Sequence, residues 1–407
     1  MPNTEHLRIS TLAADRAVHR AFSWLHLHEP TIRRWQLETI AIPAPTFHEA
    51  ARAQYFLQQF IALGLTNPHI DEAGNALAEL QPSEPWALNP GPCVLLSAHL
   101  DTVFPLTTDC TPHEEPDGPK IFGPGACDNA AGLAALLALA AALTHAEIAP
   151  ACTILFAANV GEEGEGDLRG MKHLFQSSPY TQQIKAAIAF EGSGNETVID
   201  RALGSRRLRV TITGPGGHSW ADADLPNPIL ALSSALIAIS RLPLPRNPRT
   251  TLNVGAIHGG TSVNSIPASA SADLALRSTS ALQLDRTELA VLNTLQAAIM
   301  APALHLHVQR IGDRATGALP TTSPLSLSLR AVDRHLSLAT ESRIGSTDAN
   351  LPLSLNIPAL AIGAGGTGWG MHTLNEGYDP TGRDIALRRT LLLLLDTCHL
   401  AAANSLL

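Results

Sequence analysis

The stretch "LLSAHLDTVFP", residues Leu95 to Pro105, places two ionisable side chains at the end of an apolar run. The run Val94–Ser97 is typical of a short buried strand, and His99 and Asp101 follow it directly. On an extended segment, residues two apart share a face, so these two side chains point the same way. Ligands of open α/β sheets bind at the carboxyl ends of the strands. We therefore expect a functional site at this strand end.

The sequence on either side of this stretch predicts an α/β fold with a mainly parallel sheet. Further strand-like runs lie at Cys152–Ala158 and Ala186–Phe190, and an Ala/Leu-rich segment from Ala130 to about Leu143 predicts a buried helix. Strands that alternate with helices are typical of parallel sheets. Because 407 residues exceed one ordinary core, we expect more than one domain.

The pattern changes near Arg206 and changes back after about residue 315. Between these points, alternating strands and two amphipathic helices predict a compact two-layer α+β unit. We therefore expect an inserted domain at 206–315, within an α/β domain formed by residues 1–205 and 316–407.

Composition excludes several classes of protein. The formal net charge is -9 and the basic residues are scattered, which argues against nucleic acid as a partner. The five cysteines form no C-x-x-C motif, which favours reduced thiols in a cytoplasmic protein. The N-terminus lacks the apolar core of a signal peptide, and the apolar runs from Leu133 and Thr390 are short for a bilayer. We read both runs as buried helix faces and expect no membrane partner.

Ionisable residues recur at the predicted strand ends and in Gly-rich loops. Two histidines and three carboxylates stand out: His99, Asp128, Glu163, Glu191 and His372. Carboxylates converging on one sheet edge would repel and desolvate each other without a cation. A mixed His and carboxylate set suits Zn²⁺, with Co²⁺ or Mn²⁺ also possible, and one carboxylate can bridge two ions about 4 Å apart. The set predicts two divalent metal ions.

Asp101 and Glu162 remain outside this ligand set. A carboxylate at Asp101 can accept the second ring N–H of a metal-bound His99 and so fix its tautomer. Glu162 precedes a predicted ligand, and it can take a proton from a water and pass it to a leaving amine. Each motif alone has a structural explanation, such as a helix N-cap for Asp128 or a solvated face for the paired glutamates. The ordered set at strand ends favours a metal site.

The motifs "SAHLDTVFP", "GPGACDNAAG", "GEEGEG", "FEGSG", "GPGGHSWAD" and "MHTLNEG" together resemble one known family. It comprises zinc-dependent exopeptidases and deacylases, including glutamate carboxypeptidase, acetylornithine deacetylase, succinyl-diaminopimelate desuccinylase, aminoacylase and peptidase T. The resemblance runs from about residue 35 to the C-terminus. It implies that Asp128 bridges two zinc ions, with Glu163 and His372 on one and His99 and Glu191 on the other. It also implies that Glu162 is the general base and that Asp101 orients His99.

The resemblance also assigns roles in the inserted domain, which is similar to the family's lid and dimerisation domain. His218 resembles the histidine that reaches the partner subunit's site and stabilises the oxyanion. Asn264 and Arg277 resemble residues that contact substrate oxygens or a carboxylate, and Gly365, in "GAGG", could bring a backbone N–H close to the substrate. A surface histidine, a solvated arginine and a simple tight turn are the structural alternatives. The resemblance implies a homodimer.

The implied activity is hydrolysis of a C–N amide bond in small peptides or N-acyl amino acids. Several aminopeptidases of the family have Asp where this chain has Glu191, so we favour a carboxypeptidase or deacylase. A peptidase T-like aminopeptidase or tripeptidase is the alternative, because the "GGHSWAD" region is similar to those members. A non-catalytic metal- or ligand-binding protein on the same scaffold is the alternative from another class.

Overall fold

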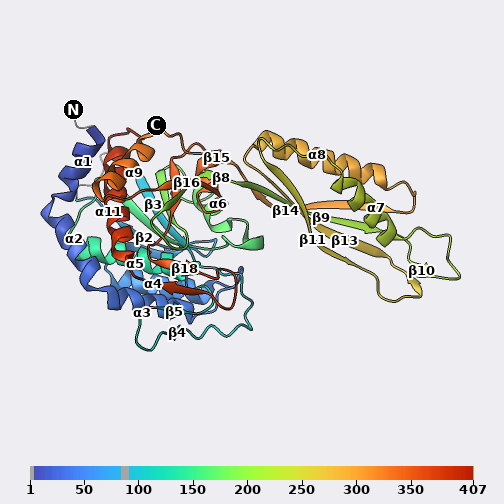
Figure 1. The fold of residues 1–407 in the computed structure, drawn as a ribbon, viewed down its shortest axis with the longest axis horizontal. Helices are drawn as coiled ribbons and strands as arrows, with labels where there is room; N and C mark the ends of the chain where they lie inside the picture. Colours follow the sequence, from blue (N-terminus) through green and yellow to red (C-terminus); the bar gives the residue numbers. More distant parts are fainter. Residues whose placement is uncertain (1–3, 84–90, 407) are drawn as a thin grey trace. The chain divides into compact units, whose positions relative to one another are not determined.

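The computed structural model describes residues 4–83 and 91–406, which divide into two compact units. Unit 1 contains Met1–Ala202 and Ala318–Leu407, and unit 2 contains Leu203–Gly317. These bounds lie close to the predicted insertion at 206–315. Figure 1 shows both units along the chain.

Unit 1 is built on a largely parallel sheet. The strand order is β1-β2-β6-β3-β7-β17-β8-β15, and β16 pairs with β8. The bounds are β1 Thr66–Ile70, β2 Ala76–Leu80, β3 Cys93–His99, β6 Thr153–Asn159, β7 Ile184–Phe190, β8 Thr197–Ala202, β15 Gly317–Ala318, β16 Glu341–Gly345 and β17 Ala359–Ile362. The central strands β6, β3, β7 and β17 all run parallel, whereas β2 pairs with β6 and β17 with β8 in antiparallel fashion. The predicted fold class is confirmed.

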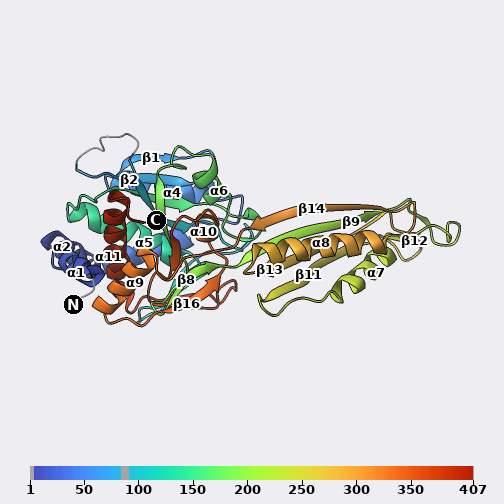
Figure 2. The same cartoon turned by 90° about the horizontal axis from the view of Figure 1, so that it is seen from above.

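Helices cover both faces of this sheet (Figure 2). The bounds are α1 Thr4–Ala13, α2 Arg16–Leu27, α3 Glu29–Ile40, α4 Ala50–Ala62, α5 Ala130–His145, α6 Arg169–Gln176, α9 Pro324–His335, α10 Asn350–Ser354 and α11 Arg383–Ala402. Helices α5 and α11 pack on β3 and β7, and α2 and α3 pack outside α5. Helix α5 is therefore enclosed by protein, which explains why every residue from Ala130 to Leu143 is buried. The two apolar runs are buried helices, as predicted.

A small second sheet of unit 1 lies beside the Gly-rich loops. It consists of β4 His113–Glu114, β5 Ile121–Phe122, β18 Thr367–Trp369 and β19 Gly377–Asp379. Strands β5 and β19 flank the loops that carry Asp128 and His372, so their pairing brings together two loops that are far apart in the sequence.

Unit 2 is a four-stranded antiparallel sheet with two helices on one face (Figure 1). Its elements are β9 Gly204–Thr213, β10 Gly217–His218, α7 Pro228–Ser240, β11 Thr250–Gly259, β12 Ser265–Ile266, β13 Ser269–Ser278, α8 Ala281–Ala298 and β14 His305–Arg314. Alternate residues of β13 are buried, as expected for strands covered on one side only. Leu, Ile and Val side chains of the sheet and helices form a separate core.

None of the helices within residues 4–83 and 91–406 has the length and hydropathy that a membrane span requires. All five cysteines carry free thiols.

Candidate metal centre and its surroundings

Three parallel strands bring the predicted ligands to one edge of the sheet in unit 1. Strand β3 ends at His99, β6 ends at Asn159 just before Glu162 and Glu163, and β7 ends one residue before Glu191. Because β6 and β7 are both parallel to β3, these ends lie at the same edge.

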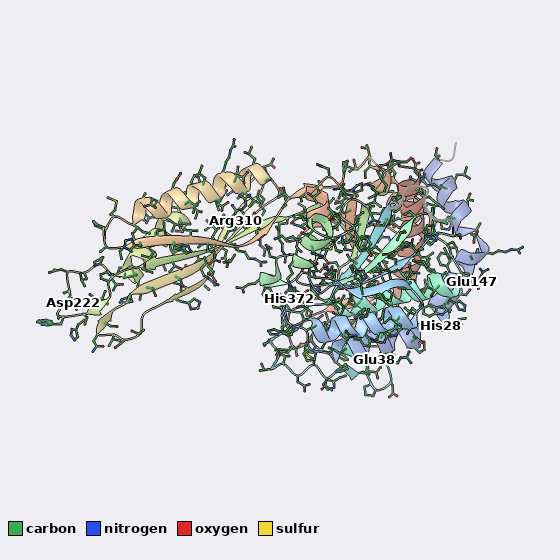
Figure 3. The ribbon with its side chains drawn as sticks, turned by 180° about the vertical axis from the view of Figure 1, so that it is seen from behind. His28, Glu38, Glu147, Asp222, Arg310 and His372 are labelled. Carbon is green, nitrogen blue, oxygen red and sulfur yellow. The ribbon has the colours of Figure 1, made fainter. Side chains whose placement is uncertain are left out.

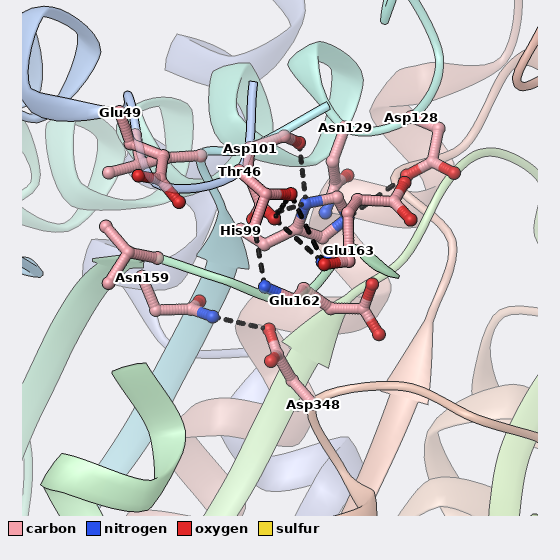
Figure 4. A network of polar contacts seen from close by, with 12 residues as sticks. Thr46, Glu49, His99, Asp101, Asp128, Asn129, Asn159, Glu162, Glu163 and Asp348 are labelled. Atoms are coloured by element: carbon pink, nitrogen blue, oxygen red, sulfur yellow. Dashed lines mark hydrogen bonds and ion pairs between the residues drawn. The ribbon is translucent and has the colours of Figure 1, made fainter. Parts of the chain in front are cut away.

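The carboxylate of Asp128 lies between two imidazoles. Its Oδ1 is 3.0 Å from Nε2 of His99, and its Oδ2 is 3.2 Å from Nε2 of His372. The same Nε2 of His372 is 3.0 Å from Oε1 of Glu163. Three possible metal-binding atoms, one each from His99, Asp128 and Glu163, lie within 4.8 Å of one another (Figure 4). Asp128 thus presents one oxygen to each histidine, and its peptide bond to Asn129 is cis.

Glu191 completes the predicted set. Its Oε2 is buried and has no hydrogen-bond partner among the described residues. Burial, and then the charge of Asp128, raise the pKa of this carboxyl well above its usual range. An unpaired buried carboxylate beside another carboxylate is costly unless a cation neutralises it. The donor set of two imidazoles and three carboxylates therefore fits divalent metal ions.

The pKa values of the other predicted ligands are shifted by burial and by the contacts among these residues. Burial raises the pKa of Glu163 to about 7, and the hydrogen bond to Asp128 raises the pKa of His372 to about 9. Burial alone would lower the pKa of His99, but its hydrogen bonds to Asp101 and Asp128 outweigh burial and raise it. Burial opposes ionisation of Asp128, yet His372 and His99 lower the pKa of its carboxyl.

Asp101 holds the turn that carries the two glutamates (Figure 4). Its Oδ1 accepts from the backbone N–H of Glu162 at 2.9 Å, and its Oδ2 accepts from that of Glu163 at 2.7 Å. Nδ1 of His99 is 3.0 Å from the backbone oxygen of Asp101 and 3.6 Å from its carboxylate. The closest partner of Nδ1 of His99 is thus the main chain of Asp101, while the Asp101 carboxylate fixes the Glu162–Glu163 turn.

Three supporting residues had not been predicted. Thr46 donates through Oγ1 to Oδ2 of Asp101 at 3.0 Å. The buried carboxylate of Glu376 accepts backbone N–H groups from Gly125, Cys127 and Asp128 at 3.0, 2.8 and 2.8 Å. Glu376 therefore shapes the loop that presents Asp128. Its position four residues after His372 was the only sequence signal available.

The third such residue, Asp348, lies next to Glu162 (Figure 4). It is fully buried, and its Oδ2 accepts from Nδ2 of Asn159 at 2.8 Å. Burial, followed by the charge of Glu162, raises the pKa of Asp348 to about 7. It lies in the segment "STDAN" before α10, which no pattern in the sequence connects to the site.

The predicted residues of unit 2 lie in two separate places. His218 and Asn264 are neighbours, because the N–H of Ser219 donates to the backbone oxygen of Asn264 at 3.0 Å. Asp222, which accepts from the N–H of His218, lies near β10 at the tip of the unit (Figure 3). Arg277 lies near the far end of β13, roughly 25 Å along the strand from Ser269, the residue at which β13 begins. Unit 2 therefore does not bring Arg277 together with His218.

His218 is exposed and has a defined tautomer. Its Nδ1 accepts from the N–H of Trp220 at 3.2 Å, so the proton of the neutral ring lies on Nε2. This leaves an N–H free to donate.

Gly365 has a structural reason to be glycine. Its φ is +82°, and a Cβ there would lie 2.7 Å from Cβ of Ala386 in α11. Its carbonyl accepts from the N–H of Gly194 and from the hydroxyl of Tyr378, each at 3.0 Å. Close packing on α11 therefore accounts for this residue.

Comparison with known proteins gives one family match and several relatives. The family described as "Peptidase family M20/M25/M40" matches residues 95–395. A probable carboxypeptidase of Aspergillus clavatus is 30% identical over 203 residues, which cover 46% of this chain and 44% of that protein. A probable carboxypeptidase of Ajellomyces dermatitidis is 30% identical over 211 residues, or 47% of this chain and 48% of that protein. The matches thus span less than half of these relatives.

Solved structures share the fold over most of the chain. A tripeptidase from Staphylococcus aureus is 22% identical with a TM-score of 0.72, covering 90% of this chain and 98% of that one. The dipeptidase Dug1p of Saccharomyces cerevisiae is 13% identical with a TM-score of 0.71, covering 94% and 98%. A dinuclear metal-binding peptidase of Bacillus subtilis is 14% identical with a TM-score of 0.66, covering 91% and 98%.

Proposed function

This chain belongs to peptidase family M20/M25/M40, and we propose that it is a metal-dependent hydrolase of C–N amide bonds in small peptides or N-acyl amino acids. The observation that carries the proposal is the placement of Asp128 between His99 and His372, with one carboxylate oxygen facing each ring. A carboxylate shared in this way suits a bridge between two cations.

We propose the following ligands for each ion. His372 and Glu163 would hold one divalent ion, His99 and Glu191 the other, and Asp128 would bridge them. Zn²⁺ is favoured by the mixed imidazole and carboxylate donors, with Co²⁺ or Mn²⁺ as substitutes. Bound divalent ions polarise a substrate carbonyl and lower the pKa of a water molecule.

Glu162 is the proposed general base. Its backbone N–H is fixed by Asp101, and the residue is 5% exposed, so the surrounding protein constrains its position. It would take the proton of the water that attacks the amide carbon and then deliver that proton to the departing nitrogen. Asp101 acts indirectly, because it positions both His99 and the Glu162 turn.

His218 is the proposed oxyanion donor. Since Nδ1 accepts a backbone hydrogen bond, Nε2–H is available to donate to the oxygen that becomes negative in the tetrahedral intermediate. The proposal assigns this donor to the site of a second copy of the chain, in a homodimer formed through unit 2. Asn264, beside His218, would contact the same substrate oxygen region. Arg277 lies far from both within unit 2, so it would contact a substrate carboxylate only in the site that does not receive His218 of the same chain.

The curated relatives are named as probable carboxypeptidases, and Glu191 favours the same activity or deacylation. A tripeptidase or aminopeptidase activity is the second candidate, supported by the fold shared with the Staphylococcus aureus tripeptidase over 90% of the chain. A non-catalytic metal-binding protein is the alternative from another class.

The test is a matched substrate panel with zinc- and cobalt-loaded protein. The panel contains free tripeptides, N-acyl amino acids and N-blocked dipeptides, with Glu162→Ala as the blank and chelator-treated protein as the metal-free control. Hydrolysis of N-blocked substrates alone supports a carboxypeptidase or deacylase. Hydrolysis only of substrates with a free amine supports an aminopeptidase. Silence with both ions bound would favour the binding protein.

A further inference from the structure

Phe47 is a bulky residue in an unusual position. Its φ is +73°, in the left-handed region that suits glycine, and its side chain is 57% exposed. Both features are unfavourable for phenylalanine, and such residues gather at functional sites. Apolar side chains that are exposed singly need no explanation, but this one combines exposure with a disfavoured backbone conformation.

The segment that contains Phe47 is hydrogen-bonded to residues of the candidate metal centre. The preceding residue, Thr46, donates to Oδ2 of Asp101 at 3.0 Å and approaches the backbone oxygen of Glu163 at 3.3 Å. Pro45 forms a β-bridge with Thr102. Phe47 is therefore one residue away from a group that contacts the Glu162–Glu163 turn.

The ring of Phe47 is supported from one side by a half-buried ion pair. The guanidinium of Arg169 lies over the ring, 5.3 Å from its centroid. Nη1 and Nη2 of Arg169 donate to the two carboxylate oxygens of Glu49 at 2.9 and 2.7 Å, and Glu49 is 2% exposed. Arg169 also packs on the turn itself, because a Cβ at Gly161 would lie 2.4 Å from its Nη1. We call Phe47, Arg169 and Glu49 the aromatic platform.

The charges of the platform do not favour an acidic substrate. The bidentate contact with Glu49 engages both terminal nitrogens of Arg169, so its charge is already neutralised. The most exposed residue of the platform is the aromatic Phe47, at 57%.

Other segments of the metal centre also present apolar side chains. Met371 precedes His372 and is 52% exposed, and its Sδ would lie 3.6 Å from a Cβ at Gly192, next to Glu191. Val103 follows the Asp101 segment and is 42% exposed, and Leu374 follows His372 and is 69% exposed. Exposed apolar residues thus border the segments that carry the ligands.

We propose that Phe47 forms a wall of the substrate site and selects a large apolar group next to the scissile amide. The favoured substrates are then peptides or N-acyl amino acids with aromatic or branched aliphatic side chains, rather than acidic ones. This inference rests on the proposed function, since it names the substrate class for that site. Contact of an apolar substrate side chain with the exposed ring of Phe47 would supply the selectivity.

The first measurement compares matched substrates with the metal-loaded full chain. N-acetyl-X, N-blocked X-Gly and Gly-X dipeptides, and free X-Gly-Gly tripeptides are tested with X as Ala, Leu, Phe or Glu. In the series that is hydrolysed, we expect kcat/KM for Phe or Leu to exceed that for Ala by about tenfold or more, the scale of discrimination by an apolar pocket. A preference for Glu over Phe overturns the proposal while leaving the hydrolase function intact.

The second measurement uses Phe47→Gly, which removes the ring and suits the φ of +73°, so the loop should keep its conformation. We expect kcat/KM for the Phe substrate to fall by about tenfold or more, and that for the Ala substrate to change less than about twofold. Leu27→Ala, a 71% exposed apolar residue at the end of α2, is the matched control and should change neither. An equal loss for all substrates, or no loss, overturns the platform.

Calorimetric binding of the same compounds separates the two levels of the proposal. It uses the metal-loaded Glu162→Gln protein, so no hydrolysis is needed. We expect the Phe compounds to bind about tenfold more tightly than the Glu compounds, and we expect Phe47→Gly to abolish this difference. This result supports the platform even if the wild-type chain hydrolyses nothing. In that case only the proposed hydrolase function fails. Equal binding of Phe and Glu compounds overturns the platform.

Discussion

The two units handle charged side chains in opposite ways. Unit 1 buries ionisable residues completely, among them His99, Asp101 and Asp348. Unit 2 has an aliphatic core, and its ion pairs involve partly exposed side chains, such as Arg310 with Glu288 at 2.7 Å and Arg209 with Asp273 at 2.8 Å. Figure 3 labels Arg310 on the surface of the unit 2 sheet.

This difference indicates where chemistry is concentrated. Taking a charge out of water is costly unless it is paired or neutralised, so a fold does not collect buried carboxylates without compensation. In unit 1 the compensation is hydrogen bonding plus the proposed cations. The ion pairs of unit 2 named above lie near water, although Arg314 of this unit is buried. Substitutions of the buried ionisable residues of unit 1 should therefore have large and specific effects. Substitutions in the partly exposed ion pairs of unit 2 should have small, additive effects.

The largest expected effect is on turnover. Glu162→Ala should lower kcat by about a thousandfold or more, because it removes the proposed proton carrier, while metal content and thermal stability stay near the wild-type values. Steady-state kinetics and elemental analysis check this. Glu165→Ala, an exposed glutamate of the same turn, is the matched control. Near-normal turnover in Glu162→Ala would remove this residue from the mechanism.

The next effect is on stability and metal affinity. Glu376→Ala leaves three backbone N–H groups of the Asp128 loop without their acceptor, so we expect the free energy of unfolding to fall by about 3 kcal/mol. Denaturant unfolding measures this loss of stability, and metal titration measures the accompanying effect on metal affinity. Glu341→Ala, an exposed glutamate of unit 1, should cost less than about 0.5 kcal/mol. If the two variants behave alike, the Asp128 loop does not depend on Glu376.

A smaller effect concerns pH in the metal-free protein. Burial raises the pKa of Glu163 and of Asp348 to about 7, and the hydrogen bond with Asp128 raises the pKa of His372 to about 9. All three pKa values lie above those of the same groups in unfolded chains. The folded chain then binds more protons than the unfolded chain, so stability falls as pH rises through this range. We expect the Tm of chelator-treated protein to be a few degrees lower at pH 8 than at pH 6. Zinc should remove or reverse this trend, and a metal-free Tm that rises with pH would contradict the proton assignment.

The smallest effect belongs to unit 2. Arg310→Gln breaks partly exposed ion pairs with Glu288 and Asp313, and it should cost about 1 kcal/mol or less, with a decreasing effect at high salt. Denaturant unfolding at low and high salt measures this. A loss as large as that of Glu376→Ala would mean that the two units do not differ in the way described.

Local patterns in the sequence predicted the elements that carry the site. The run that ends at His99 became β3, the Ala/Leu run became α5, and the bounds of both differ from the prediction only at their ends. Apolar periodicity and glycines act within a few residues, so such elements can be read from the chain. The alignment of β3, β6 and β7 follows from the same reasoning, because parallel strands share one carboxyl edge.

The supporting contacts came only from the tertiary structure. Glu376 accepts from the N–H of Cys127 across 249 positions in sequence, and Asn159 donates to Asp348 across 189. The platform likewise joins Glu49 to Arg169 across 120 positions. A carboxylate's partners depend on which loops meet in space, and no local pattern encodes that meeting. The sequence by itself thus determined the proposed ligand residues and the strands that end next to several of them, whereas the folded chain decided which buried groups hold them in place.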